Sequence, residues 1–587
     1  MAISLLGGLE NFQAIHQFAL AIEVVFAIIL LKLTFPGSAM SAAEFLRQAR
    51  AGRHQTRAAL VGISLLSLAC FRFATIQRVT LSSTWSDHFD ALIYPLSQVV
   101  AGKTLLVDLP SQYGLFPEFL APLFRLTSLS VARLSLVFAI FQLASILCLH
   151  FVLSRYIKNR GVMVITTLAL AMVTYGIGGA DGLSEELDPY FQYWPVRFLF
   201  PALTVFLFDW FIRNTEQIRL WILIGIAAVS LLWNLDAGAA IILALGSVFG
   251  AFTVLSCKPK SDSLRQLLVL GRSGKFWLLS MLAIPLSCLF LFATFFLYLH
   301  LKSGEMPNLA AVSEYQSIFY KLGFFMIPLP LEAPGAWMAV LGVYLLSFIT
   351  GLEEIRCRKN QRFGAIIIYL SLLGLGLFVY YQGRSHLSNL IAVSWPAVLL
   401  TGLLVDRQLR AHRLGLIPAG DFWPCMAGVT ALVVPAIGLL FSIPLLIIQA
   451  DFFPIHSGHL EPAQRQLRDE LDFIRSACTP GSGCLLLCKR QGIYSAELGL
   501  ASAWKGPGLS ELLLETDRQR LLSLIRAGRF HTIVLARDPV ILSQLGMALS
   551  DRTLLSHYLH VATNSSGTLW LLKSKSTPTA GPAAAAG

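Results

Sequence analysis

Long runs of apolar residues, separated by short polar segments, repeat along the chain as far as residue 450. A helix that crosses a bilayer needs about 20 consecutive, mostly apolar residues. By that length criterion the pattern predicts a polytopic α-helical membrane protein with about 12 transmembrane helices. The expected spans are residues 18–35, 58–76, 131–154, 162–177, 198–212, 220–233, 239–255, 276–301, 336–352, 363–381, 390–405 and 422–448.

Basic residues are concentrated in every second loop between these spans. Loops with an excess of Lys and Arg stay in the cytoplasm. The opposite loops, which hold most of the acidic residues, should therefore be extracytoplasmic, together with the N-terminus and everything beyond the last span. The basic loops are residues 47–57, 155–160, 213–219, 258–275, 356–362 and 407–413.

Composition supports a membrane protein and argues against nucleic-acid binding. Of the 587 residues, 56% are hydrophobic and only 13% are charged, whereas a soluble domain carries about 25% charged residues. The net charge of +12 comes from basic residues scattered through short loops. No run of Lys and Arg is interleaved with aromatic residues, so we expect the charge to set topology and expect no nucleic-acid partner.

After residue 451 the composition becomes that of a soluble domain. Helical spacing covers residues 461–478 and 509–527, and short apolar runs predict strands at 483–489, 532–537 and 568–573. We expect a small α/β domain without a GxGxxG or P-loop fingerprint. The expected divisions are an extra N-terminal span with a basic loop (1–57), a transmembrane domain (58–450) with an outer loop (77–130), the extracytoplasmic α/β domain (451–575) and a disordered tail (576–587).

Three of the nine cysteines, Cys478, Cys484 and Cys488, cluster in the C-terminal domain. Structural zinc sites need four ligands, usually with CxxC-like pairs, and this C-x5-C-x3-C spacing does not supply them. One disulfide among the three is an alternative to buried thiols if the domain is extracytoplasmic.

The first large outer loop is unusually acidic for so apolar a chain. Its stretch 85–114, WSDHFDALIYPLSQVVAGKTLLVDLPSQYG, contains Asp87, His88, Asp90 and Asp108. Carboxylates just outside a span stay ionised because interfacial water reaches them. Such a loop suits chemistry on a substrate whose headgroup stands at the membrane surface. The following residues, LFPEFLAPLFRL, predict a helix that lies in the interface.

Asp87 is the first carboxylate after the second span and is our candidate general base, because an acceptor hydroxyl needs a base within hydrogen-bond reach. The alternative is that it only solvates the start of the loop. Asp90 lies three residues on, so in a helix both carboxylates share a face. Such a pair could hold a divalent cation, raise the pKa of one member, or lie on a solvated face. His88 could bind a phosphate oxygen or pack.

Basic and amide side chains lie beside spans on the other outer loops. Arg197, Arg384 and His386 suit a phosphate, because the planar guanidinium matches its oxygens. Arg197 could instead be an interfacial anchor. Arg384, Ser385, His386 and Asn389 form a dense polar set between two apolar spans, and Asn234 and Asp236 occupy a tight turn, where they could also cap a helix.

The sequences SDHFDALIYPLSQVVAGKTLLVDLPSQYGLFP, WPVRFLFPAL, WNLDAG and YYQGRSHLSNL resemble motifs of the GT-C superfamily, which are integral-membrane glycosyltransferases that use polyprenyl-phosphate-linked sugars. The resemblance covers residues 58–448. It implies inverting transfer of a sugar to a glycan, lipid or protein acceptor on the outer face of a bacterial inner membrane. The superfamily's loop aspartate maps to Asp87, and its basic residues near the donor phosphate map to Arg197 and Arg384.

Two features depart from that pattern. Asp-His replaces the usual Asp-Glu or Asp-x-Asp pair, which leaves open Asp87 or Asp90 as the key group and whether a divalent cation binds. The span before residue 58 is also atypical. We expect Asp87 and Asp90 to be catalytic and no other cofactor to be needed. The expected substrate-binding residues are His88, Asp108, Gln112, Tyr113, Arg197, Asn234, Asp236, Arg384, His386 and Asn389.

Two other functions compete with this interpretation. A transporter or flippase of lipid-linked sugars usually has ionisable residues at mid-membrane, and Glu23 and His150 are the candidates inside spans. A non-catalytic scaffold gives the outer polar loops no reason to converge. Convergence of these residues at one site favours the enzyme.

Overall fold

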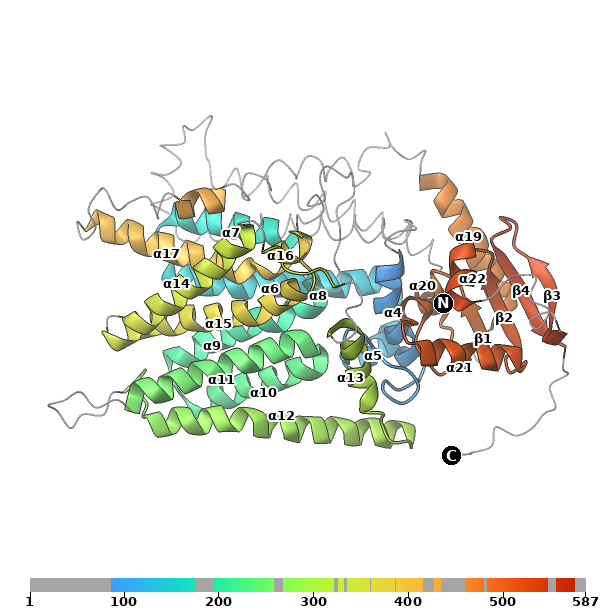
Figure 1. The fold of residues 1–587 in the computed structure, drawn as a ribbon, viewed down its shortest axis with the longest axis horizontal. Helices are drawn as coiled ribbons and strands as arrows, with labels where there is room; N and C mark the ends of the chain where they lie inside the picture. Colours follow the sequence, from blue (N-terminus) through green and yellow to red (C-terminus); the bar gives the residue numbers. More distant parts are fainter. Residues whose placement is uncertain are drawn as a thin grey trace.

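The computed structural model describes residues 86–175, 194–257, 268–320, 326–331, 335–358, 360–385, 387–414, 427–433, 460–479, 483–546 and 556–575. Within these ranges the chain forms a bundle of long helices and, at one end of it, a mixed α/β region from the C-terminal part of the sequence (Figure 1). The predicted spans 18–35 and 58–76, most of 422–448 and the tail 576–587 lie outside the described residues.

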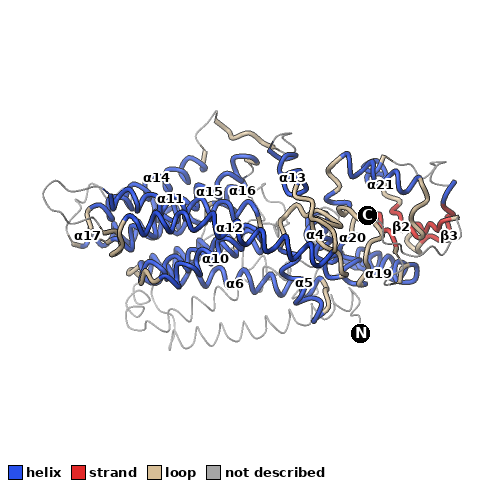
Figure 2. The backbone as a smooth tube through the Cα atoms, turned by 90° about the horizontal axis from the view of Figure 1, so that it is seen from below, coloured by secondary structure: helices blue, strands red, loops and turns tan. Residues whose placement is uncertain are grey.

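The bundle consists of long apolar helices that run in similar directions (Figures 1 and 2). Six segments of the described chain are long and apolar enough to cross a bilayer, and three shorter apolar helices, Phe89–Val100, Arg160–Thr174 and Gln217–Trp233, accompany them. The prediction of a polytopic helical membrane protein is therefore confirmed, although the described residues do not give the full count. The helices are α6 (Val131–Tyr156), α7 (Arg160–Tyr175), α9 (Leu199–Arg213), α10 (Gln217–Trp233), α11 (Leu235–Cys257), α12 (Gly274–Ser303), α14 (Ala336–Arg356), α15 (Gln361–Gly383) and α17 (Trp395–Arg413).

The predicted span 390–405 is wrong in one respect, because it is two helices rather than one. Helix α16 (Leu387–Val393) ends before Ser394, and α17 starts at Trp395. Pro396 lies in the first turn of α17, where its missing N–H has no intrahelical acceptor to satisfy. In one continuous helix, residue 396 would have to donate its N–H to a carbonyl in the preceding turn. Proline has no N–H to donate, so the helix breaks here.

Glycines allow the most extensively paired helices, α14 and α15, to approach closely. A Cβ on Gly351 would lie 2.8 Å from the carbonyl oxygen of Gly364, and one on Gly364 would lie 2.7 Å from that of Gly351. Small residues at such crossings let backbones pack directly, as is common in membrane helices. Helix α15 is consequently buried along most of its length.

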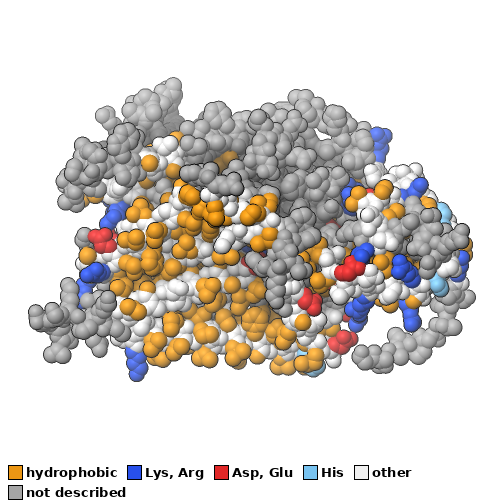
Figure 3. Space-filling model, in the orientation of Figure 1, with side chains coloured by type: hydrophobic (Ala, Val, Ile, Leu, Met, Phe, Trp, Pro, Cys, Tyr) orange, Lys and Arg blue, Asp and Glu red, His pale blue; other side chains and the backbone are white. Residues whose placement is uncertain are grey.

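Charged side chains mark the end of the bundle that lies away from the C-terminal region. Asp209, fully buried, pairs with Arg155 and Arg213, and Glu354 pairs with Arg407. In Figure 3 the visible face between this end and the C-terminal region is mostly hydrophobic. A hydrophobic band bounded by charge is what a bilayer-spanning protein presents.

His150, a candidate for mid-membrane chemistry in a transporter, packs inside the bundle. Its side chain is 3% exposed, and Nδ1 lies 3.4 Å from the hydroxyl of Thr167 on α7. This contact is that of a core histidine between two helices. The other candidate, Glu23, lies outside the described residues.

Three shorter helices lie between the bundle and the C-terminal region: α4 (Ser86–Val100), α5 (Phe116–Thr127) and α13 (Ala310–Tyr320) (Figures 1 and 2). Much of the predicted outer loop is thus helical. Helix α5 coincides with the expected interfacial helix. It buries Phe116 and Phe124, while Leu126 on its other face is 88% exposed.

The C-terminal region contains a four-stranded sheet in the order β1-β2-β4-β3. Strands β1 (Cys484–Leu487) and β2 (Thr532–Ala536) are parallel, and β4 (Leu569–Ser574) is antiparallel to both β2 and β3 (Tyr558–Thr563). The three predicted strands coincide with β1, β2 and β4, whereas β3 was not predicted. The helices of this region are α19 (Leu460–Ala477), α20 (Gln491–Leu498), α21 (Glu515–Arg526) and α22 (Pro539–Leu545).

Two local predictions in this region are settled by the structure. The helix expected over 509–527 is instead a 3-10 turn, Leu509–Glu511, followed by α21. Of the three clustered cysteines, Cys478 and Cys484 form a disulfide and Cys488 is a buried thiol. The disulfide therefore joins the end of α19 to β1.

Candidate active site

The first turn of α4 contains Asp87 and His88. Their backbone is helical, and their side chains lie outside the described residues, as does all of His386. From Phe89 to Val99 every residue of α4 is buried, so the helix is enclosed on all sides. Asp87 therefore stands at the N-terminal end of a helix whose position is fixed by packing.

Asp90 faces the C-terminal region rather than open solvent. It is fully buried, and its Oδ1 accepts the backbone N–H groups of Gly492 (2.5 Å) and Ile493 (3.3 Å). Its Oδ2 accepts the hydroxyl of Ser510 (3.2 Å). A carboxylate so placed caps the N-terminus of α20. Gly492 is required here, because a Cβ would lie 2.8 Å from the backbone nitrogen of Tyr94.

These contacts bear on whether a divalent cation could bind between Asp87 and Asp90. N–H and hydroxyl donors surround the Asp90 carboxylate, whereas a cation needs oxygen ligands. Nor does any group of three or more metal-binding side chains gather among the residues that the structure describes. Both Asp90 oxygens are thus engaged by hydrogen-bond donors, and the side chain of Asp87, the other member of the pair, lies outside the described residues.

Asp108 also has a local partner on each oxygen. Its Oδ2 accepts the backbone N–H of Thr104 at 2.9 Å, and its Oδ1 lies 3.1 Å from Nζ of Lys505 in the C-terminal region. Nearby, Lys103 donates to the carbonyl of Trp504 at 2.6 Å, and burial lowers the pKa of Lys103 to about 8. This part of the loop is thus held against the C-terminal region.

A polar cluster lies where α8 (Trp194–Arg197), α11 and the loop before α5 meet. Arg197 Nη2 lies 3.1 Å from Asp236 Oδ2, and the guanidinium stacks over the ring of Tyr380 at 4.5 Å. The ring of Tyr113 lies 5.8 Å from the same guanidinium. Only 9% of the Arg197 side chain is exposed. Arg197 is therefore a buried, oriented cation rather than a solvated surface group.

Asn234 has the capping role considered from the sequence and a second contact as well. Its Oδ1 accepts the backbone N–H of Ala237 (3.0 Å) at the start of α11. Its Nδ2 donates to the carbonyl of Tyr113 (2.9 Å). One amide thus orients α11 and fixes the loop residue that faces Arg197.

A glycine brings the Tyr113 loop against the bundle. Gly114 has φ +101°, and a Cβ on it would lie 2.3 Å from the carbonyl oxygen of Trp233. Leu115 then donates its N–H to Leu232 at 3.0 Å, while the Trp233 indole donates to Val196 at 2.7 Å. These bonds join the loop, the end of α10 and the residue before Arg197.

Arg384 contributes to the electrostatics of the same cluster. Burial raises the pKa of Tyr113, and the positive charges of Arg197 and Arg384 oppose that rise. Arg384 follows α15, and its carbonyl accepts a hydrogen bond of 2.8 Å from Nδ2 of the buried Asn389. Asn389 thus shapes the turn that presents Arg384.

Gln112, next to Tyr113, is held by the C-terminal region. Its backbone N–H donates to Oε1 of Glu511 at 3.0 Å. Glu511 is fully enclosed, and burial raises its pKa to about 8. Sequence reasoning missed Glu511, because a carboxylate whose partner is a backbone amide leaves no pattern in the sequence.

The predicted site residues thus fall into two groups. One group comes together around Arg197 and contains Tyr113, Asn234 and Asp236. The positive charge of Arg384 also acts on the Tyr113 side chain. Asp90, Asp108 and the backbone of Gln112 contact the C-terminal region instead.

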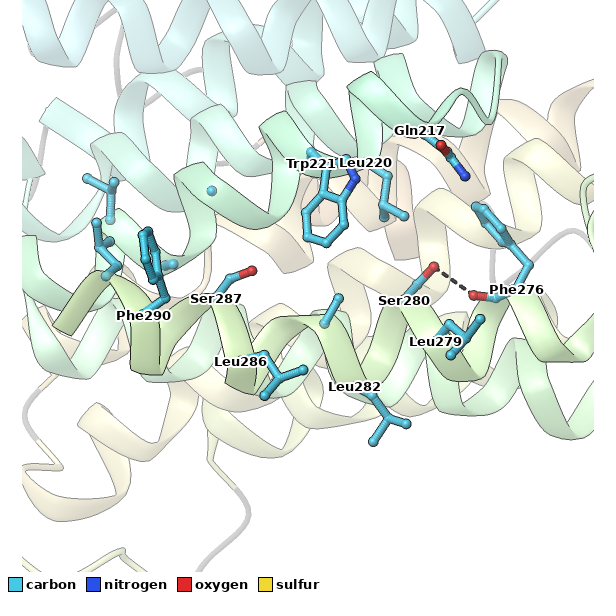
Figure 4. A pocket seen from close by; sticks show the side chains of 15 residues that line it. Gln217, Leu220, Trp221, Phe276, Leu279, Ser280, Leu282, Leu286, Ser287 and Phe290 are labelled. Carbon is cyan, nitrogen blue, oxygen red and sulfur yellow. Dashed lines mark hydrogen bonds between the residues drawn. The ribbon is translucent and has the colours of Figure 1, made fainter. Parts of the chain in front are cut away.

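An apolar groove runs between α10 and α12 (Figure 4). Its volume is about 930 Å³, and its lining includes Trp221, Leu286 and Phe290. Leu286 is 66% exposed and Phe290 is 74% exposed, so the groove opens on the outer surface of the bundle. Its few polar side chains include Ser280, whose hydroxyl donates to the carbonyl of Phe276. The groove suits a hydrocarbon chain.

No protein-family model matches the sequence. No curated protein matches it either. Among solved structures, the fold is similar to the crystal structure of ArnT from Cupriavidus metallidurans in the apo state, with a TM-score of 0.44 and 12% sequence identity. The similarity covers 82% of this chain and 92% of that chain. At this identity and TM-score, the likeness assigns no reaction, donor or acceptor to this chain.

Proposed function

We propose that the chain is a membrane glycosyltransferase that moves a hexosyl or pentosyl group from a polyprenyl-phosphate-linked donor to a glycan, lipid or protein acceptor. The reaction would take place on the outer face of a bacterial inner membrane. The observation that carries the proposal is the cluster that the buried Arg197 and Tyr113 form with Asp236. A scaffold would give these residues, which come from distant parts of the sequence, no reason to converge.

A lipid phosphate leaves this reaction with added negative charge, and a preorganised cation stabilises such charge best where water is excluded. Arg197 meets this requirement, because Asp236 and the ring of Tyr380 fix the plane of its guanidinium. A planar guanidinium matches phosphate oxygens. Arg384 and His386 would complete the phosphate site, with Asn389 holding the Arg384 turn.

The apolar groove supports a lipid-linked donor. The groove follows α10 as far as Val229, one helical turn before Trp233. The indole of Trp233 donates a hydrogen bond to the carbonyl of Val196, the residue before Arg197. A polyprenyl tail could lie in the groove while its phosphate reaches Arg197. A soluble nucleotide-sugar would make no use of such a surface.

In the proposed step, Asp87 takes the proton from the acceptor hydroxyl. The acceptor oxygen bonds to the anomeric carbon as the bond from that carbon to the lipid phosphate breaks. A single displacement of this kind inverts the anomeric configuration. His88 would contact the substrate, and Asp90 would support Asp87 by fixing α4 against the C-terminal region.

The direct test uses purified protein and radiolabelled polyprenyl-phosphate sugars. Asp87→Asn should abolish transfer while the protein stays folded, because the amide cannot accept the proton. Asp472→Asn is the matched control, since the Asp472 side chain is 70% exposed and remote from α4. Undiminished turnover by Asp87→Asn would remove Asp87 from the mechanism.

A further inference from the structure

A second cavity, unrelated to the Arg197 cluster, lies where the ends of α4 and α5 and the start of α6 meet α20. Its volume is about 340 Å³, and its lining includes Arg125, Arg133 and Glu497. It is large enough for one polar headgroup and too small for a whole lipid. Nothing in the proposed transfer reaction uses these residues.

Glu497 brings a buried carboxyl group to this cavity with one oxygen unsatisfied. The side chain is 4% exposed, and its Oε1 accepts the backbone N–H of Val131 at 2.8 Å. Its Oε2 is buried and has no hydrogen-bond partner among the described residues. Burial raises the pKa of Glu497 to about 8, against the opposing charge of Arg133. A buried acceptor without a donor is costly, so a donor from a ligand would be stabilising.

Two guanidinium groups border the same cavity. Arg125 donates to the carbonyl of Val99 at 2.6 Å, and Arg133 donates to the carbonyl of Ser128 at 3.1 Å. Neither forms an ion pair within the part of the chain that the structure describes. Both are at least partly exposed. Their charges are therefore available to an anion.

The cavity stands at the headgroup end of a membrane span. Arg133 is in the first turn of α6, a helix long and apolar enough to cross a bilayer. Leu136 and Ile140 lie three and seven residues further on, hence on the same helix face. They are 49% and 52% exposed. A lipid whose headgroup occupied the cavity could lay its acyl chains along this face.

We propose that this cavity binds phosphatidylethanolamine, with its phosphate on Arg125 and Arg133 and its ammonium group on Oε2 of Glu497. The headgroup carries an anion and an N–H donor two carbons apart, which matches the two guanidiniums and the unsatisfied carboxyl oxygen. An ammonium at Oε2 favours the ionised carboxylate. Phosphatidylcholine offers the same phosphate without an N–H donor, and phosphatidylglycerol offers hydroxyl donors without the positive charge.

The test is native mass spectrometry of the delipidated full-length protein, titrated with the three lipids carrying identical acyl chains. A charged hydrogen bond in a buried site should favour phosphatidylethanolamine over phosphatidylcholine by about tenfold or more. Glu497→Gln should remove that preference and leave phosphatidylcholine binding unchanged. Arg133→Gln should weaken binding of all three lipids, whereas Arg526→Gln, an exposed charge on α21 away from the cavity, should change none.

The wild-type comparison needs no substitution, so it stands even if a variant fails to fold. Equal affinity for the three lipids would overturn the proposal. So would a preference for phosphatidylglycerol, which would point to a net anion site, or a phosphatidylethanolamine preference that survives Glu497→Gln.

Discussion

The backbone N–H of Gln112 donates to Oε1 of Glu511 across 399 positions of sequence, at 3.0 Å. The next residue, Tyr113, faces Arg197. On α4 the hydrogen bond runs the other way, because the backbone N–H of Gly492 in the C-terminal region donates to the Asp90 carboxylate. The C-terminal region and the outer loop therefore hold each other, and the geometry of the candidate site depends on both.

Removing the Asp90 carboxylate should loosen this docking. Asp90→Ala deletes the hydrogen bonds to Gly492, Ile493 and Ser510 and leaves the start of α20 uncapped. Loss of a helix cap alone costs about 0.5–2 kcal/mol. Hydrogen exchange should therefore speed up at Gly492 and Ile493 and also along α4.

Asp538→Ala is the control for that experiment. Asp538 caps α22 through the N–H of Val540 at 2.8 Å, in the same region but away from α4. Its carboxylate also lies 3.5 Å from Lys489, just before α20, so the substitution should accelerate exchange in α22 and leave exchange in α4 at the wild-type rate. If Asp90→Ala left exchange in α4 at the wild-type rate, the proposed supporting role of Asp90 would be wrong.

Docking should weaken as the pH rises from about 4.5 to about 8, in line with the raised pKa of Glu511. In this range the docked Glu511 keeps a proton that an exposed glutamate has lost, so docking takes up a proton and becomes less favourable with increasing pH. One such carboxyl contributes a slope of at most about 1.4 kcal/mol per pH unit. The exchange rate at the amide of Gln112, divided at each pH by the rate of an unprotected amide, measures it.

Glu511→Gln should flatten that pH profile, because its amide oxygen can still accept from Gln112 and no longer titrates. Burial also raises the pKa of Glu497 to about 8. Glu497 therefore still contributes part of the pH dependence of docking in the Glu511→Gln variant. The control Glu515→Gln removes an exposed carboxylate and should leave the profile unchanged. Docking that becomes more favourable as the pH rises from about 4.5 to about 8 would contradict the assignment of a neutral Glu511.

Gly114→Ala should be far more damaging than Gly102→Ala, although both glycines have a similar positive φ, +101° and +106°. The left-handed conformation alone costs an alanine about 1–2 kcal/mol. At Gly114 the new Cβ would also meet the backbone of Trp233 at 2.3 Å, whereas at Gly102 nothing lies within 4 Å. We expect both substitutions to lower the unfolding temperature, Gly114→Ala by much more, and we expect reduced turnover for Gly114→Ala only. Equal effects of the two substitutions would mean that the loop can retreat from Trp233 without consequence.

The membrane spans were predictable because bilayer thickness imposes both length and composition on them. Helix α6 begins at Val131 as expected, and α12 extends the prediction by two residues at each end. Helix α4 was harder to predict. Its residues from Phe89 to Val99 are all buried, including the polar Asp90, Ser97 and Gln98, so the polarity of the sequence does not reveal which positions are enclosed, and the helix contains Pro95.

The site was predictable only in part. Loop charges placed Arg197 and Asp236 on one side of the membrane, and the structure brings them to 3.1 Å. The partners of Asp90 could not be predicted, because two of them are backbone N–H groups some 400 residues away, and every non-proline residue offers the same donor. The role of a buried carboxylate therefore depended on the fold.

Arg197→Lys should reduce transfer sharply while preserving charge. Lysine can approach Asp236 but has no planar group to lie on Tyr380 and to present two parallel donors to a phosphate. Loss of one preorganised donor to a developing anion costs about 10²–10³ in turnover. We expect kcat to fall by that order with radiolabelled polyprenyl-phosphate sugars, with a smaller change in KM.

Arg219→Lys is the matched control. Arg219 also combines an ion pair with a ring contact, because it lies 3.2 Å from Glu216 and 4.7 Å from the ring of Trp210. It lies in the first turn of α10, away from the cluster. The turnover of the Arg219→Lys variant should stay at the wild-type level. A wild-type kcat for Arg197→Lys would show that the cluster needs charge alone, and would take from Arg197 the role of orienting the leaving phosphate.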